Sequence, residues 1–249
     1  MPSPPSQPNV AQDNAASRQN RSKLSLGARA AIGFSLGSIA GAAILFIPAG
    51  TLKFWQGWVY LAILLVPSSS CYIYLLKHDR QLLERRLESK EPVSEQKLLM
   101  RLVKFLFVAA FVLTGFDYRF GWSRGWMGGV PLWLTVLSEA LAFGGMLSAA
   151  SVITVNRFAA RTVRVEPGQT VISTGLYRFV RHPMYAASLV LWLFTPFALG
   201  SYVSLPVFVL LMLLYVLRLL NEEKLLRAEL PGYTEYCSHT RYRLIPHVW

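Results

Sequence analysis

Long apolar segments alternate with short charged ones along this chain of 249 residues. Five segments carry no charged residue or only one: residues 30–49, 55–76, 105–116, 130–155 and 183–217. About 20 apolar residues are needed to cross the ~30 Å hydrocarbon layer of a bilayer. Only 105–116 is too short, and we expect Lys104 and Arg119 beside it to extend their charged ends to the interfaces. The pattern therefore predicts a multi-pass membrane protein.

The last apolar segment, 183–217, is too long for a single crossing. Its 35 residues would form a helix of about 52 Å at a rise of 1.5 Å per residue. Pro196, Gly200 and Pro206 interrupt the segment and favour a tight turn within it. We therefore predict a hairpin of two spans, which gives an all-α integral membrane protein with about six transmembrane helices.

The basic residues predict how these spans are oriented. With six spans, 22 of the 25 Lys and Arg residues lie on the side that holds both termini, and only Lys53, Arg119 and Arg124 lie on the other. An excess of Lys and Arg in short loops marks the cytoplasmic side. We therefore expect both termini in the cytoplasm. The net charge of +12 then requires no nucleic-acid partner.

Composition divides the chain into three regions. Residues 1–25 are rich in Pro, Ser, Gln and Asn, which predicts a disordered cytoplasmic tail. Residues 26–155 hold the first four spans. Their 77–104 loop reads as two short amphipathic helices broken near Pro92, lying on the membrane surface or forming a solvated linker. Residues 156–249 hold the hairpin between two polar stretches. No group of Cys and His has a metal-binding spacing, so we predict no metal.

The first polar stretch ends at His182 and Pro183, where the hairpin begins. Proline favours the first position of a helix and keeps the preceding residue out of the helical conformation, which places His182 at a helix N-terminus. Free N–H groups and the helix dipole favour an anion there. Arg178 and Arg181 add positive charge nearby. The stretch therefore predicts an anion-binding corner.

The second polar stretch begins with Arg218, Glu222 and Glu223 at the end of the last span. Paired carboxylates near the negative end of a helix dipole require a cation, and Arg218 lies one turn before Glu222. An internal ion pair beside a solvated basic loop explains each feature singly. Because the hairpin returns both stretches to one depth, together they indicate a site for a zwitterion such as S-adenosylmethionine, with Tyr177 and Tyr185 as aromatic neighbours.

Three motifs in this region have a recognisable order. They are Gly-Leu-Tyr-Arg-Phe-Val-Arg-His-Pro-Met-Tyr at 175–185, Arg-x-x-x-Glu-Glu-x-x-Leu at 218–226, and Leu-Pro-Gly-Tyr-x-x-Tyr followed by Arg-Tyr-Arg-Leu-Ile-Pro at 230–246. This order resembles the isoprenylcysteine carboxyl methyltransferase family, which overlaps with the phospholipid N-methyltransferases. The ending is similar to bacterial members and implies a bacterial inner membrane. Leu176 departs from the pattern, because the family usually has proline there.

The resemblance implies an all-helical fold whose C-terminal region encloses S-adenosylmethionine in a cytoplasmic pocket. It implies Arg218 and Glu222 as catalytic residues, with Arg218 near the methyl acceptor. The cofactor-binding residues that it implies are Tyr177, Arg178, Arg181, His182, Pro183, Tyr185, Glu222 and Glu223.

The expected activity is carboxyl O-methylation of a lipophilic, isoprenylcysteine-like acceptor that enters from the surrounding lipid. A carboxylate is ionised at neutral pH and needs no general base, so the protein would align the reactants and exclude water. Three alternatives stay open: a phospholipid amine N-methyltransferase with Glu222 or Glu223 as base, a sterol-type reductase, and a scaffold or transporter supported by Glu139 within a span. The sequence fixes neither the acceptor nor the oligomeric state.

Overall fold

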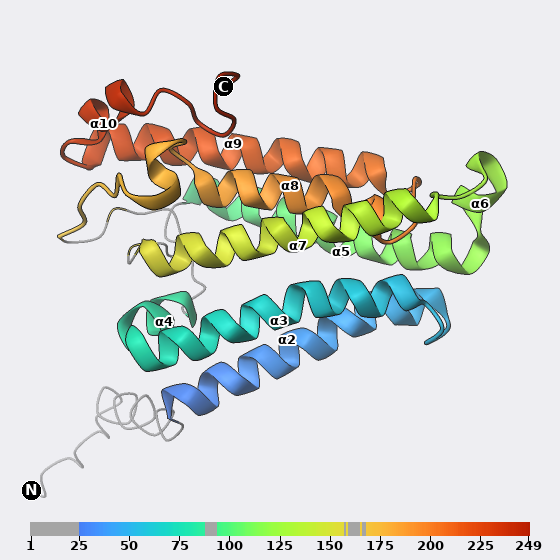
Figure 1. The fold of residues 1–249 in the computed structure, drawn as a ribbon. Coiled ribbons are helices and arrows are strands. Elements are labelled where there is room, and N and C mark those ends of the chain that lie inside the picture. Colours follow the sequence, from blue (N-terminus) through green and yellow to red (C-terminus); the bar gives the residue numbers. More distant parts are fainter. Residues whose placement is uncertain (1–24, 88–93, 157, 159–164, 166–167) are drawn as a thin grey trace, which may run out of the picture.

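The computed structural model describes residues 25–87, 94–156, 158, 165 and 168–249. All regular elements within these residues are helical (Figure 1). They are α2 (Leu26–Ala49), α3 (Trp55–His78), α4 (Arg80–Leu87), α5 (Ser94–Phe120), α6 (Trp122–Met127), α7 (Leu132–Val155), η1 (Gly175–Arg178), α8 (Pro183–Ala198), α9 (Leu205–Glu229) and α10 (Tyr233–His239). The chain is an all-α integral membrane protein, as the hydrophobic pattern predicts. The predicted tail up to residue 24 and the predicted break near Pro92 lie outside the described residues.

Five of the described helices are long and apolar enough to cross a membrane: α2, α3, most of α5, α7 and α9. The fifth predicted span, α8, has only 16 residues and is about 24 Å long, less than the ~30 Å hydrocarbon layer. Pro183 begins this helix, and Gly200 turns the chain with φ of +71° just after it ends. The hairpin therefore pairs one short apolar helix with one full-length span.

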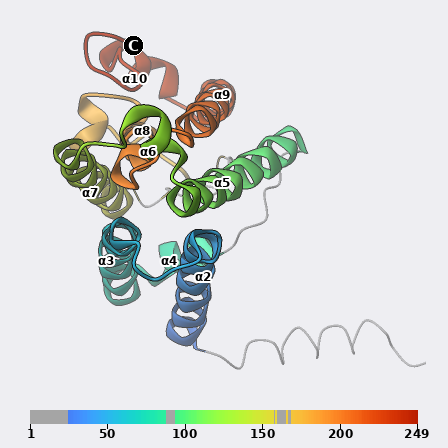
Figure 2. The same ribbon diagram turned by 90° about the vertical axis from the view of Figure 1, so that its right-hand side faces the viewer.

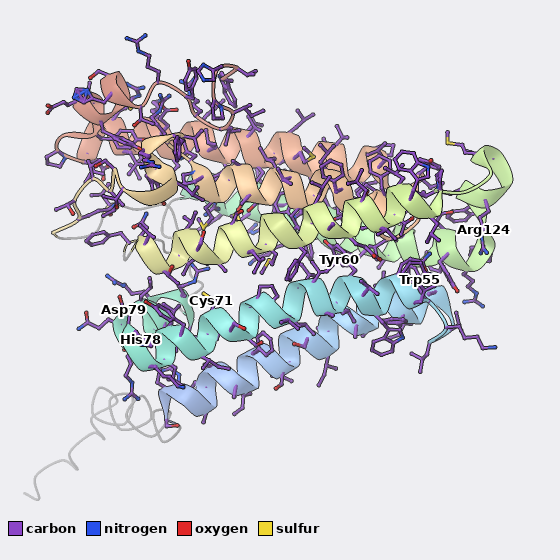
Figure 3. All side chains as sticks on the ribbon, in the orientation of Figure 1. Trp55, Tyr60, Cys71, His78, Asp79 and Arg124 are labelled. Carbon is purple, nitrogen blue, oxygen red and sulfur yellow. The ribbon has the colours of Figure 1, made fainter. Side chains whose placement is uncertain are left out.

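The helices form two groups, which are clearest along the bundle axis (Figure 2). The antiparallel pair α2 and α3 lies on one side of a group formed by α5, α7, α8 and α9. In the second group α7 and α8 approach closely, since a Cβ atom at Gly145 would lie 2.9 Å from the carbonyl oxygen of Ala187. Tyr60 of α3 joins the two groups through a 2.6 Å hydrogen bond between its hydroxyl and that of Thr195 in α8 (Figure 3).

Helix α4 corrects part of the prediction for the loop at 77–104. Leu82 and Leu83 are 1% and 0% exposed, and they pack in a cluster with Leu75 of α3 and Ile153 of α7. Their apolar face is therefore buried against the bundle rather than facing a membrane surface. The second predicted helix is also not separate, because the described residues from 94 onward belong to α5.

The two ends of the bundle differ in construction. The α6 end, which holds α6 and the α8–α9 turn, is closed by Asp117 and Ser123. The Asp117 carboxylate accepts hydrogen bonds from the Ser123 backbone N–H at 2.8 Å and from its hydroxyl. The same hydroxyl accepts the backbone N–H of Tyr202 at 2.8 Å, which ties the turn to α5. The α10 end, with α4, η1 and α10, holds the site described next (Figure 1).

Candidate active site

A cavity of about 600 Å³ lies at the α10 end between α5, α7, α8 and α9. Its wall is completed by Leu64 of α3, Arg86 of α4, Phe158, residues 169–172, η1 and α10. Six of the nine predicted site residues line it: Tyr177, Arg181, His182, Tyr185, Arg218 and Glu222. Its volume is in the range of small-molecule sites, about 300–1,000 Å³. The structure therefore brings both polar stretches of the sequence to one cavity.

The cavity exists because α8 stops short of its neighbours. From the contact between Gly145 and Ala187, α7 continues for ten residues to Val155, whereas α8 has only four more back to Pro183. The difference of six residues corresponds to about 9 Å of helix. The space beyond the end of α8 is bounded by the longer α7 and α9, so the N-terminus of α8 points into a polar recess.

The C-terminal segment 240–249, here called the strap, holds the start of α8 in place. The backbone N–H groups of Arg181 and His182 donate to the carbonyl oxygens of Tyr242 and Arg243 at 2.9 and 3.0 Å. Pro183 follows as the first helical residue and is buried. The helix N-terminus predicted after His182 is thus present. Backbone hydrogen bonds to the strap fix the position of the two residues before it.

Glu223 is the centre of an ion-pair cluster beside the cavity rather than part of its lining. Its carboxylate lies 2.9 Å from Arg181 Nη2, 2.9 Å from Arg227 Nη2 and 2.5 Å from Arg243 Nε. Arg181 also donates to the carbonyl oxygens of Thr240 and Arg241 at 2.9 and 2.6 Å. Arg181 therefore fastens the strap to α9, and the arginines compensate the charge of Glu223.

Glu222, the neighbouring acid, faces the cavity. One residue along an α-helix turns a side chain by about 100°, which separates it from the cluster around Glu223. The Tyr185 hydroxyl donates to the Glu222 carboxylate at 2.5 Å. The Arg218 guanidinium lies close to the hydroxyls of Tyr185 and Tyr215 and to Glu222. The polar end of the cavity thus holds one carboxylate and one guanidinium within a short distance.

Burial keeps the imidazole and the phenol groups of the wall neutral. Burial lowers the pKa of the His182 imidazole to about 4, an effect that Glu223 opposes and Arg181 reinforces. Its Nε2 atom lies 3.4 Å from the Tyr233 hydroxyl and 4.0 Å from a Glu223 oxygen. Burial also raises the pKa of Tyr177 to about 12. At neutral pH these groups act through hydrogen bonding and shape rather than charge.

Tyr177 is held rigidly in the wall by two partners. Its hydroxyl accepts a 2.7 Å hydrogen bond from the Asn156 amide, and its backbone carbonyl oxygen accepts one of 2.6 Å from the Tyr236 hydroxyl. Burial raises the pKa of Tyr236 to about 12. Tyr177 is therefore fixed between the end of α7 and α10.

Three predicted site residues lie outside the lining. Arg178 is exposed on the far face of η1, with its guanidinium carbon 4.4 Å from the centre of the Phe179 ring. Pro183 is buried where α8 begins, and Glu223 holds the strap. The sequence therefore predicted six residues that line the cavity. The structure places Arg178, Pro183 and Glu223 next to the cavity rather than in its lining.

Sequence reasoning did not single out several residues that complete the site. Tyr233 and Tyr236 of α10 line the cavity, and Arg243 of the strap pairs with Glu223. Asn156 positions Tyr177. A signal was present for three of them, because Tyr233, Tyr236 and Arg243 belong to the terminal motifs at 230–246 that carry the family resemblance.

Comparison with known proteins finds one family model that overlaps this region. Residues 133–228 match the model of the isoprenylcysteine carboxyl methyltransferase (ICMT) family. The match covers α7, η1, α8 and nearly all of α9, and so includes every predicted site residue from Tyr177 to Glu223. No curated protein matches the chain. Over residues 133–228 the chain is therefore similar to the isoprenylcysteine carboxyl methyltransferase family.

Proposed function

We propose that the chain uses S-adenosylmethionine to methylate the carboxylate of a lipophilic, isoprenylcysteine-like acceptor. One observation carries the proposal: a single cavity has a polar end, with Glu222, Arg218 and the N-terminus of α8, and an apolar arm between the membrane helices. A polar zwitterionic cofactor and a lipophilic acceptor need two such environments that meet.

The polar end suits the amino-acid portion of S-adenosylmethionine. The N-terminus of α8, with Met184 and Tyr185 in the lining, offers backbone N–H groups and the positive end of the helix dipole to a carboxylate. Glu222 offers a carboxylate to an ammonium group. The ring of Tyr177 offers a stacking surface for the adenine. The volume of about 600 Å³ leaves room for part of a second molecule.

The apolar arm suits the lipid portion of the acceptor. Its lining includes Leu64 of α3, Phe107 of α5, Gly145 of α7 and Leu191 and Trp192 of α8. These residues lie in helices of the membrane-spanning bundle, so a lipophilic chain can occupy the arm while its polar head points toward Arg218. Burial of each methylene group contributes about 0.8 kcal/mol, which favours long apolar acceptors.

Arg218 is the residue placed to orient the acceptor. It is 6% exposed and lies between the polar end and Tyr215, whose ring is 4.4 Å from that of Trp192 in the arm. A guanidinium can bind a carboxylate through two parallel hydrogen bonds. Such binding fixes the attacking oxygen, and the neighbouring Tyr185 and Glu222 keep Arg218 from neutralising the acceptor completely.

The proposed methyl transfer requires only that the protein align the reactants and exclude water. Bound S-adenosylmethionine supplies an electrophilic methyl group on a sulfonium, and methyl transfer makes a C–O bond, breaks the S–C bond and leaves a neutral thioether. The acceptor carboxylate is already ionised at neutral pH, so no side chain has to remove a proton. Arg218, Glu222 and Tyr177 act by holding the reactants in line, and the strap and α10 exclude water.

An acceptor assay with the purified full-length protein tests this proposal. Transfer of labelled methyl groups from S-adenosylmethionine is measured with a prenylcysteine analogue and with phosphatidylethanolamine. We expect base-labile methyl ester on the prenylcysteine analogue and no label on phosphatidylethanolamine. Label on phosphatidylethanolamine alone would assign the chain to the amine N-methyltransferases. Absence of both label and cofactor binding would support the scaffold alternative.

A further inference from the structure

A second groove lies on the opposite face of η1 from the cavity. It has a volume of about 480 Å³ and is lined by Ser151, Val152 and Val155 of α7 and by residues 175–179. Tyr177 lines both spaces, so η1 is the partition between them. Gly175 adopts φ of +61° where η1 begins, and a Cβ atom there would lie 3.6 Å from Val155.

The groove has the composition of a site for a phospholipid. Leu176, Phe179 and Val155 are 39%, 50% and 42% exposed, so its rim is apolar. Arg178 is the one charged residue among the described residues of the lining, and its guanidinium lies over the Phe179 ring. Apolar walls beside a single guanidinium match acyl chains beside a phosphate.

The groove is also at the depth of lipid head groups. It lies at the last residues of α7, a helix of 24 residues and about 36 Å, which exceeds the ~30 Å hydrocarbon layer by a few ångströms. Helix α7 lies at the outside of the bundle (Figure 2), and Val155 in the groove is 42% exposed, so lipid around the bundle could reach it. We propose that the groove between α7 and η1 binds an anionic phospholipid of the bilayer, with Arg178 contacting its phosphate.

This site gives Arg178 a role that the cofactor cavity does not. Arg181, three residues later, is fastened to Glu223 and the strap, whereas Arg178 faces outward from η1. Basic residues at a membrane surface each contribute about 1 kcal/mol toward anionic lipid, which corresponds to about fivefold in binding preference. The site rests on the groove and its charge alone, and does not depend on which methyl acceptor the protein uses.

Native mass spectrometry of the full-length protein, exchanged between micelles containing phosphatidylglycerol and phosphatidylcholine, tests the proposal. We expect the wild type to retain phosphatidylglycerol preferentially and Arg178→Gln to lose about fivefold of that preference. Arg241→Gln, an exposed arginine of the strap at the same end, is the matched control and should behave as wild type. Ser151→Phe, which fills the groove without changing charge, should lower retention of phosphatidylglycerol.

Three results would overturn the site. They are an unchanged preference in Arg178→Gln, an equal loss in Arg241→Gln, and full lipid retention in Ser151→Phe. Melting temperatures equal to wild type are required of all three variants, so that a change in lipid binding is not a change in folding.

Discussion

The two ends of the bundle use their carboxylates differently. At the α6 end, Asp117 accepts hydrogen bonds from Ser123, and Ser123 in turn holds the α8–α9 turn. At the α10 end two consecutive acids have different surroundings. Glu223 is paired with three arginines, whereas Glu222 faces a cavity. A carboxylate enclosed by fixed partners stabilises structure, and one that borders open space is available to a ligand.

The largest effect is expected on catalysis, at Arg218 beside the carboxylate that faces the cavity. Replacement of Arg218 by Ala should lower kcat/KM for methyl transfer about 1,000-fold, because the acceptor carboxylate loses its fixed position. The affinity for S-adenosylhomocysteine should stay within about threefold of wild type. Steady-state kinetics and calorimetry measure the two quantities, with the exposed Lys224→Ala on the same helix as control. Equal loss of transfer and cofactor affinity would contradict the assigned role.

The next largest effect is expected at Glu223, on the free energy of unfolding. Glu223→Gln leaves Arg181 and Arg243 without a counter-charge, and breaking a buried ion pair costs about 3 kcal/mol or more. We expect a lower free energy of unfolding in detergent and faster proteolysis within the strap. Glu229→Gln, an exposed acid at the end of α9, is the control. A strap that stays protected in Glu223→Gln would show that the ion-pair cluster does not hold it.

His182 should make the stability depend on pH. Its pKa is about 4 in the folded protein because of burial, and about 6.5 in an unfolded chain. The unfolded state therefore takes up the proton first, and stability falls as the pH decreases from about 6.5 toward about 4. At pH 5 the loss relative to pH 7 is about 2 kcal/mol. His182→Asn should remove this part of the pH dependence, and an identical slope in wild type and variant would disprove the assignment.

The smallest effect is expected at the closed end. Asp117→Asn keeps an acceptor for the Ser123 N–H but weakens the charge-assisted hydrogen bonds, so the free energy of unfolding should fall by about 1 kcal/mol. The affinity for S-adenosylhomocysteine should not change, since Asp117 lies in the last turn of α5 before α6, and α6 and α10 lie at opposite ends of the bundle (Figure 1). A matching loss of cofactor affinity would show that the two ends are coupled.

The hydrophobic pattern was sufficient for the architecture but not for helix lengths. Runs of uncharged residues located all the long helices, because charge in the hydrocarbon layer is costly. The pattern assigned α8 a full span because residues 183–217 form one apolar run, whereas the observed helix has 16 residues. Its shortness, which creates the cavity, comes from Pro183 at its first position and from the turn at Gly200 just after its end.

The sequence predicted where the candidate site lies, but it predicted the roles of its individual residues less well. The order of Arg218, Glu222 and Glu223 located the acidic corner, but it did not distinguish the roles of the two acids. Their separation comes from the 100° step along α9 and from Arg243, which reaches Glu223 from 20 residues away. Arg178 and Arg181 were likewise predicted together, and η1 turns them to different faces.

The central claim is that Glu222 faces a cofactor while its neighbour Glu223 maintains structure. Calorimetric titration of the purified protein with S-adenosylhomocysteine, comparing Glu222→Gln with Glu229→Gln, tests it most directly. We predict binding about 30-fold weaker for Glu222→Gln, from loss of a charge-assisted hydrogen bond, with wild-type affinity for Glu229→Gln and an unchanged melting temperature for both. Wild-type affinity in Glu222→Gln would contradict the account.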